Sequence, residues 1–411
     1  MERRGEPAIL IVDPGGIGAR VADARKLRGL TQQGLARRVP CSPSLVSQVE
    51  RGSRPPTPWF VAAVARALHV GLTDLTGQPY RGTTGHTDRA HASIPGIRAV
   101  LNYWDVPPAA LVAPRAPAAL RADIATIDGL VGRADYARLG AMLPGVLEEL
   151  SAVRHDGADG PRAEAAALLV HGYIAVKFLA YRLGYVDLVS VAVALAGSAA
   201  RESGDPELSA LVAEERGQVF LATLAHDVGL AFFARARREF EPVLAGSESG
   251  LAILGSMHLR SAIMAARDRR PGETWDHLGQ AREAADRVGR DTGHHGLAFG
   301  PSNVRINEVA AAADLDDADE AIRRTEGFTP PPGLPAERSS HHYIDLARAQ
   351  LAAGRRDEAL RSLLRADRLA PQHTRNHPMA RETVTGLLRA HTRVPESLRS
   401  LAHRMGAGPT P

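Results

Sequence analysis

The 411-residue sequence has one cysteine, only two lysines and few aromatic residues, which make up 4% of the chain. The single cysteine, Cys41, excludes an intramolecular disulfide framework and any zinc site built from several cysteines. The longest runs without a charged residue, Leu188–Ala200 and Thr292–Val304, span 13 positions, whereas a membrane helix needs about 20 apolar residues. Met1–Gly5 lacks the basic-then-apolar order of a secretory signal. We therefore expect a cytoplasmic protein with no membrane partner.

The residues that are abundant favour helices. Lys26 and Lys177 are the only lysines among 50 basic residues, so the other 48 are arginine. Arginine ranks close to alanine among the best helix formers, and no run alternates apolar and polar residues for long enough to predict a strand. The composition therefore predicts an all-α protein.

The positive charge is concentrated in one segment. Residues 17–76 contain nine basic and three acidic residues, a net charge of +6, whereas the whole chain carries only +4. A small basic segment beside a larger and nearly neutral body is typical of a module that binds a polyanion.

Residues 17–76 have the periodicity and the boundary signals of five short helices. Apolar residues recur every three or four positions from Ile17, and Gly29 ends the first helix. Three further helices follow good N-capping side chains, which are Thr31, Ser42 and Thr57. Leu72–Leu75 predicts a last short turn.

The rest of the chain divides by composition. Residues 1–16 are expected to form a flexible arm, 77–117 a linker with one short helix near Ile97–Tyr103, and 406–411 a tail. Residues 118–405 show one helical pattern after another, separated by Gly, Pro and Asp. Such a stretch is either a helix bundle or an α-solenoid of stacked helix pairs.

One segment favours the solenoid, because its residues have the spacing of a tetratricopeptide repeat. These residues are Tyr343, Leu346, Ala347, Gly354, Ala359, Leu363, Ala366 and Pro371. The alanines allow two antiparallel helices to approach closely, while the glycine and the proline end them. Gln350 departs from the pattern, which usually has an aromatic residue there. At about 35–40 residues per helix pair, the region holds about seven pairs.

Residues 17–76 resemble the DNA-binding domain of the Xre/lambda-repressor-type helix-turn-helix family. The matching residues are Arg28–Gln33, Leu35-Ala36, Ser42–Gly52, Arg54-Pro55 and Ala65–Leu68. Two positions depart from the family pattern, because Pro40 stands where the turn usually has glycine, and Gly34 lies where an acidic residue is common. The resemblance implies a five-helix domain whose second helix crosses the DNA backbone and whose third helix lies in the major groove.

The same resemblance implies which side chains meet DNA. The expected contacts to phosphates are Gln32, Arg37, Arg38, Arg51 and Arg54, with Gln32 also bracing the third helix. The expected contacts to bases are Pro43, Ser44, Leu45, Ser47 and Gln48. Gln48 can bond adenine bidentately, and Leu45 can touch a thymine methyl. The alternative for any one of these side chains is that it belongs to an ordinary solvated helix face.

The helices from about Ala118 to Met405 look like the body of actinobacterial Xre-type regulators with tetratricopeptide-like repeats. The matching segments are Tyr136–Leu139, Leu143-Pro144, Leu183–Leu188, Phe299–Val304 and Asp345–Ala349. In related peptide-responsive regulators, asparagines on inner repeat helices clamp a peptide backbone, to which an amide can both donate and accept. Here Asn303 and Asn307 share one helix face, so they are the candidate ligand-binding residues. The alternative is that they are polar residues near a helix start.

Sixteen histidines raise the question of a metal site, notably at His294-His295, His341-His342 and the pair His373/His377. No His-Glu-x-x-His motif or other ligand quartet accompanies them, and two histidines four residues apart supply only two ligands. Asp314–Glu320 lacks the glycine of a calcium loop. No nucleophile motif, phosphate loop or isolated acidic pair is present. The sequence therefore predicts no metal, no cofactor and no enzymatic activity.

Together these patterns predict a sequence-specific transcriptional regulator that binds double-stranded DNA as a homodimer. The solenoid is expected to provide dimerisation and to bind a small ligand or short peptide, with the 77–117 linker transmitting the resulting change. The alternative is a signal receptor or scaffold that acts mainly through a protein partner. Operator binding at physiological salt would separate these two functions.

Overall fold

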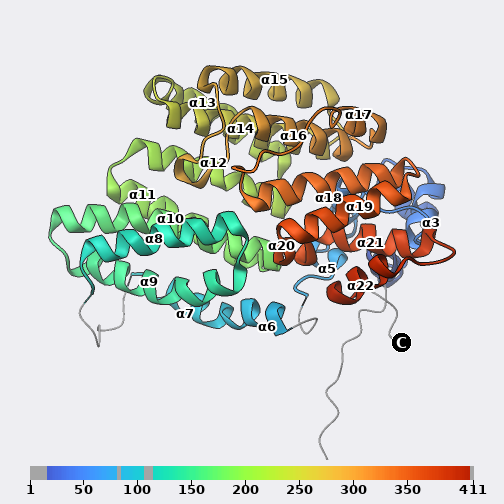
Figure 1. Cartoon of the computed structure of the whole chain (residues 1–411), viewed down its shortest axis with the longest axis horizontal. Helices are drawn as coiled ribbons and strands as arrows, with labels where there is room; N and C mark the ends of the chain where they lie inside the picture. The colour runs from blue at the N-terminus through green and yellow to red at the C-terminus, as the bar shows by residue number, and fades with distance from the viewer. Residues whose placement is uncertain (1–15, 81–84, 106–113, 408–411) are drawn as a thin grey trace, which may run out of the picture.

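The computed structural model describes residues 16–80, 85–105 and 114–407, in which every regular element is a helix (Figure 1). The extended pairing found in these residues is one isolated bridge between Thr292 and Phe299. The predicted all-α fold is thereby confirmed. Except for Gly16, the predicted arm lies outside the described residues, as does the tail beyond position 407.

The first five helices form a small N-terminal module, as predicted. They are α1 (Ile17–Leu27), α2 (Gln32–Arg38), α3 (Pro43–Glu50), α4 (Pro58–Leu68) and α5 (Leu72–Thr76). Each of the three predicted capping side chains accepts a hydrogen bond from the backbone N–H three residues later, at 3.0–3.2 Å. Local sequence signals alone therefore determine where α2, α3 and α4 begin.

The helices from α8 onward pack as consecutive antiparallel pairs and form the solenoid. The pairs are α8 (Pro117–Arg133) with α9 (Tyr136–Asp156), α10 (Asp159–Leu183) with α11 (Val186–Ser203), α12 (Pro206–Thr223) with α13 (His226–Leu244), α14 (Glu248–Arg267) with α15 (Pro271–Val288), α16 (Pro301–Asp314) with α17 (Ala318–Arg323), and α18 (Ala336–Ala352) with α19 (Arg356–Leu369). The short 3₁₀ helix η1 (His294–Gly296) precedes α16, and α20 (Pro371–Asn376), α21 (Pro378–Ala390) and α22 (Glu396–Met405) follow.

The predicted tetratricopeptide spacing corresponds to the pair α18 and α19. Ala347, Ala359 and Ala366 are completely buried, so small side chains do let the two helices approach closely. Gly354 follows α18 with a φ of +75°, a left-handed conformation that favours glycine. Gln350 accepts a hydrogen bond of 2.7 Å from Ser362 of α19, so a polar contact replaces the aromatic packing usual at this position.

The segment predicted as a linker differs from that expectation, because it contains two packed helices. They are α6 (Gly85–Ala92) and α7 (Ile94–Asn102), and both lie against α9 (Figure 1). Ile94, Ile97, Val100 and Leu101 of α7 are each at most 4% exposed and belong to the same core as the first solenoid helices. Burial of this apolar face outweighs the weak helix propensity of the Gly- and Pro-rich composition.

The N-terminal module packs directly on the last part of the solenoid, as the blue and red helices of Figure 1 show. One continuous hydrophobic core contains residues of α1 to α5 together with residues of α16 to α19, α21 and α22. Polar contacts reinforce it, because the Ile17 N–H donates to Glu382 at 3.2 Å and Arg54 pairs with Asp316 at 2.8 Å. A change in the solenoid can therefore reach the module by direct contact, without passing through a linker.

Helix α10 is long and apolar enough for a membrane span by length and composition. However, 61% of its most apolar window is buried inside the protein. In the part of the chain that the structure describes, α10 packs between α9 and α11. These contacts are those of a core helix.

Candidate functional site

A buried polar network holds α3 against α1 and α2. The Arg25 guanidinium donates to the Glu50 carboxylate at 2.6 and 2.8 Å, and Gln32 donates to the same carboxylate at 2.8 Å. Burial alone would raise the pKa of Glu50, but these hydrogen bonds outweigh it and hold the pKa below its ordinary value. The network fixes the angle at which α3 projects from the module.

No role was predicted for Arg25 or Glu50. A signal was nevertheless present, because Arg25 continues the buried face of α1 at the spacing set by Ile17 and Val21. A charged residue on a buried face requires a partner. Glu50, at the end of α3, is that partner.

The predicted base-reading side chains lie along α3 with graded exposure. Pro43 and Ser44 are exposed, Ser47 and Gln48 are half-buried, and Val46 and Val49 on the opposite face are buried. Gln48 donates to Ser44 at 3.4 Å, so these two polar side chains share one helix face. Leu45 is half-buried and packs against the module's core. The side chains of α3 are thus arranged with the polar face outward.

The predicted phosphate contacts have two kinds of surroundings. Arg37, Arg38 and Arg51 are exposed, and Arg51 donates to the Ser47 carbonyl at 3.3 Å. Gln32 and Arg54 are already engaged, Gln32 by Glu50 and Arg54 by Asp316 of the loop between α16 and α17. The solenoid therefore holds one of the predicted DNA-contacting arginines in this arrangement.

A cavity of about 520 Å³ separates the C-terminal end of α3 from the solenoid. Gln48, Arg51 and Arg54 line it from the module, while Asp316 and Glu382 line it from the solenoid. Arg348 also lines it from the solenoid, so the module side carries two positive charges and the solenoid side a net negative charge of one. The end of α3 and the loop after it consequently face the solenoid, whereas Ser44 at the other end of α3 is exposed.

A second cavity, of about 650 Å³, lies within the solenoid between helices α8, α10, α12, α14, α16 and α18. Asn303 and Asn307 of α16 both line it. The Asn307 amide donates to the Asn303 carbonyl at 2.8 Å and lies 3.3 Å from its side-chain oxygen. The structure therefore brings the two candidate ligand-binding residues together at a cavity, with part of their hydrogen-bonding capacity used between them.

Among the charged residues that line the same cavity, Lys177, Glu214 and Glu215 are buried and Arg260 is half-buried. Lys177 of α10 pairs with Glu215 of α12, while Arg260 of α14 donates to Glu214 at 2.9 Å and lies 3.6 Å from Glu215. Burial alone would raise the pKa of both carboxyl groups. Lys177 and Arg260 outweigh it at Glu215, whose pKa is lowered, but not at Glu214, whose pKa is raised. We call these residues the ion quartet.

Comparison with known proteins identifies the N-terminal module. Residues 17–76 match a family model described as a helix-turn-helix domain. Over 58 residues the chain is 34% identical to the uncharacterized HTH-type transcriptional regulator YazB of Bacillus subtilis (strain 168). That match covers 14% of this chain and 84% of YazB.

A solved structure also resembles the chain over most of its length. It is the Bacillus thuringiensis PlcR in complex with the peptide PapR7 and DNA, and the likeness covers 76% of this chain and 94% of that chain. The sequence identity is 13% and the TM-score is 0.29. At this TM-score and identity, the likeness assigns no function to the present chain.

Proposed function

Since this chain belongs to the family of helix-turn-helix transcriptional regulators, we propose that it binds a specific operator as a homodimer in the cytoplasm and that its solenoid senses a ligand. The chain acts by binding and not by catalysis. The observation that carries the DNA-binding part is the braced α3, whose polar face points outward from a module of net charge +6. Fixed geometry and positive charge are the two requirements for reading a DNA groove.

In this proposal α3 enters the major groove and α2 crosses the backbone. Ser44, Ser47 and Gln48 read base edges, with Pro43 and Leu45 in apolar contact beside them. Arg37, Arg38 and Arg51 meet phosphates, and Gln32 adds a phosphate contact to its brace. Arg54 joins them once it exchanges Asp316 for a phosphate.

We expect Gln48→Ala to weaken operator binding by about 1–3 kcal/mol and to relax the base preference at one position, because a bidentate base contact is lost. Arg51→Ala is the matched control. The loss of a phosphate contact weakens binding to all DNA sequences equally, and it reduces the slope of log affinity against log salt concentration by about one. Fluorescence anisotropy with an operator and its single-base variants measures both effects. Equal loss on every sequence for Gln48→Ala would show that α3 is placed in the wrong register.

The homodimer follows from the small reach of one module. A single α3 contacts too few base pairs for genomic specificity, and a two-fold pair would read two half-sites about 34 Å apart. We expect light scattering of the operator complex to give the mass of DNA plus two chains of 43.7 kDa each. A stable complex of one chain on one half-site would contradict the dimer.

The ligand is proposed to occupy the 650 Å³ cavity. Asn303, Asn307 and Gln218 supply amides, and the ion quartet supplies both charges. This lining suits a small polar ligand or a short peptide, which carries amides and two charged ends. The cavity wall includes α16 and α18, whose core extends into the N-terminal module, so an occupant that favours one packing of these helices would change operator affinity.

We expect a short synthetic peptide selected for binding to change operator affinity by roughly 5–150-fold, the usual size of such coupling. Asn303→Ala/Asn307→Ala should abolish that response and leave operator affinity without peptide unchanged. Titration of the peptide into the labelled operator complex measures both. If the double variant responds like the parent, the ligand lies elsewhere in the solenoid.

A signal receptor or scaffold that acts through a protein partner is the second candidate function. The contact between Arg54 and Asp316 favours it, because the module is held by the solenoid. Chromatin immunoprecipitation with sequencing decides between the two functions. A set of sites sharing one pseudo-palindromic motif supports the regulator, and the absence of enriched sites supports the scaffold.

A further inference from the structure

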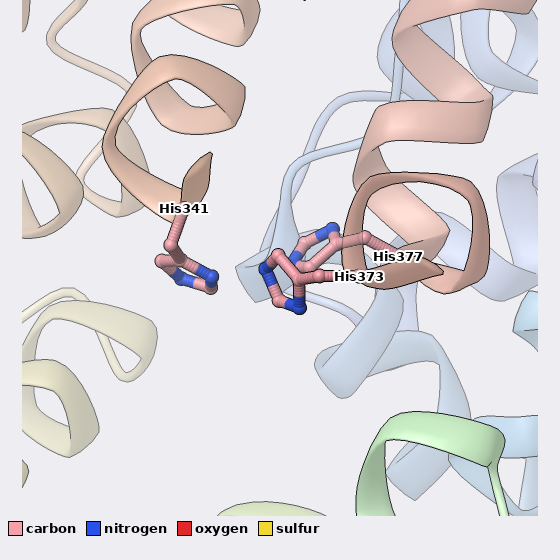
Figure 2. A group of neighbouring side chains, drawn as sticks. All are labelled: His341, His373 and His377. Atoms are coloured by element: carbon pink, nitrogen blue, oxygen red, sulfur yellow. The ribbon is translucent and has the colours of Figure 1, made fainter. Parts of the chain in front are cut away.

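Three histidines converge where α18 meets α20 (Figure 2). The ring centres lie 5.6 Å apart for His341 and His373, 5.0 Å for His341 and His377, and 5.5 Å for His373 and His377. One ligand nitrogen from each ring lies within 4.8 Å of the others. The sequence pattern showed only the pair His373 and His377, at the end of α20 and just after it, and therefore predicted no metal, whereas the fold adds a third ring from α18. We call the three residues the histidine triad.

The triad has ring nitrogens that lack any protein partner. His341 Nδ1, His373 Nε2 and His377 Nδ1 are buried without a hydrogen bond, and the His373 residue is only 1% exposed. Buried polar atoms without a partner are rare in folded proteins. Other buried histidine nitrogens without a partner, such as those of His226 and His391, occur singly, whereas here three lie in one cluster and can share one ligand.

The opposite nitrogen of one ring is held by a hydrogen bond, because His373 Nδ1 lies 3.1 Å from the Tyr136 hydroxyl. His341 Nε2 lies 3.5 Å from the Asp345 carboxylate, a distance at which charges attract but no hydrogen bond forms. Metal-binding histidines typically use their second nitrogen in this way, because the outer contact fixes the tautomer and the ring orientation. The unpartnered nitrogens of His341 and His373 are the ones left for a ligand.

The spacing of the rings fits one shared cation. A ligand nitrogen lies about 2.0–2.1 Å from Zn²⁺, which puts each ring centre about 3.2 Å from the metal and tetrahedrally arranged ring centres about 5.2 Å apart. The observed separations bracket that value. Figure 2 shows the His341 ring facing the other two rings across a short gap.

Charged groups also surround the triad. Glu337 and Asp345 flank His341 on α18 and supply negative charge, part of which is paired with Arg182, Arg338 and Arg348.

We propose that the histidine triad binds one divalent transition-metal cation of the Zn²⁺ class, with the fourth coordination position open to a cavity. Three histidines and an open position are a known zinc arrangement. All three residues line a cavity of about 120 Å³ whose far wall is built from the N-terminal module, including Pro58, Val61 and Leu72. The cation ties α18 to α20 and to the start of α21, at the place where the solenoid meets that module.

The test uses the full chain, made metal-free with a chelator and then given Zn²⁺ or Co²⁺. We expect one Zn²⁺ per chain after gel filtration, a higher unfolding temperature with Zn²⁺, and the visible absorption of four-coordinate Co²⁺. His341→Gln and His377→Gln should each weaken Zn²⁺ binding at least ~100-fold. The matched control is His342→Gln, because His342 is the next residue of α18 but packs against Phe328, with ring centres 5.4 Å apart, and should bind like the parent.

If a histidine variant fails to fold, Tyr136→Phe still tests the proposal. This variant keeps all three histidines and removes only the hydroxyl beside His373. This variant should weaken Zn²⁺ binding by ~10–100-fold. In the absence of metal, its unfolding temperature should equal that of the parent. The proposal is overturned if the chelated parent chain, after incubation with Zn²⁺ and gel filtration, retains no Zn²⁺. It is equally overturned if His341→Gln, His377→Gln and His342→Gln all bind Zn²⁺ as tightly as the parent, because the ion would then sit on other histidines.

Discussion

Arg25→Ala is expected to lower the free energy of opening of α3 by about 3–5 kcal/mol, because this is the usual cost of removing one partner from a buried ion pair. The Arg25 and Glu50 side chains are only 10% and 6% exposed, so the Glu50 carboxylate would be left buried with Gln32 as its main donor. Hydrogen exchange of the α3 amides in the full chain measures the loss. A change of that size corresponds to exchange that is roughly 100-fold faster or more.

The matched control is Arg37→Ala, which removes an exposed arginine from the same module. Its effect on exchange should stay within about 0.5 kcal/mol. Operator affinity then separates the two roles, because Arg25→Ala should weaken DNA binding by disordering α3, whereas Arg37→Ala should weaken it only through a lost phosphate contact. If α3 in Arg25→Ala exchanges as slowly as in the parent, the network does not hold α3.

In the N-terminal module, local sequence signals were sufficient to predict where helices begin. Thr31, Ser42 and Thr57 predicted three helix starts, and all three cap as expected. Capping depends on a few neighbouring residues, so the sequence contains all the information needed. The repeat spacing from Tyr343 to Pro371 succeeded for α18 and α19 for the same reason, since each pair buries its own small residues.

The docking of the module was not predicted, because it depends on which surfaces meet in space. A signal existed in α4, where Trp59, Phe60, Val61, Ala62 and Ala63 are consecutive. A helix that is apolar all round is buried all round, so one side of α4 had to face something outside the module. Periodicity shows that such a face exists, but not that the solenoid covers it.

The polar clusters were missed for a related reason. The histidine triad joins α18 to the α20 region, and the ion quartet joins α10, α12 and α14. Each cluster needs at least one member from a distant part of the chain, such as His341 for the pair His373/His377 or Lys177 for Glu214-Glu215, so no motif spacing reveals the whole cluster. Lys177 was still a visible clue, since it is one of two lysines and lies in an otherwise apolar stretch of α10 that predicts burial and hence a charged partner.

Removal of that lysine is expected to have the largest effect on the solenoid. Lys177 and Glu215 are each 5% exposed, and Glu214 is 2% exposed. Lys177→Met keeps the apolar length of the side chain but leaves two buried carboxylates with Arg260 as the remaining cation of the quartet. We expect the free energy of unfolding to fall by about 3–5 kcal/mol, measured by urea unfolding of the full chain with circular dichroism.

The double variant Lys177→Met/Glu215→Gln tests whether charge imbalance is the cause. It removes one charge of each sign and leaves Arg260 paired with Glu214, so most of the lost stability should return, as it does when a buried pair is replaced by neutral groups. Arg216→Ala is the control for an exposed cation, because Arg216 lies next to Glu215 on α12, and it should change stability by about 1 kcal/mol at most. If the double variant is no more stable than Lys177→Met, then lost packing at position 177, and not the unpaired carboxylate, explains the destabilisation.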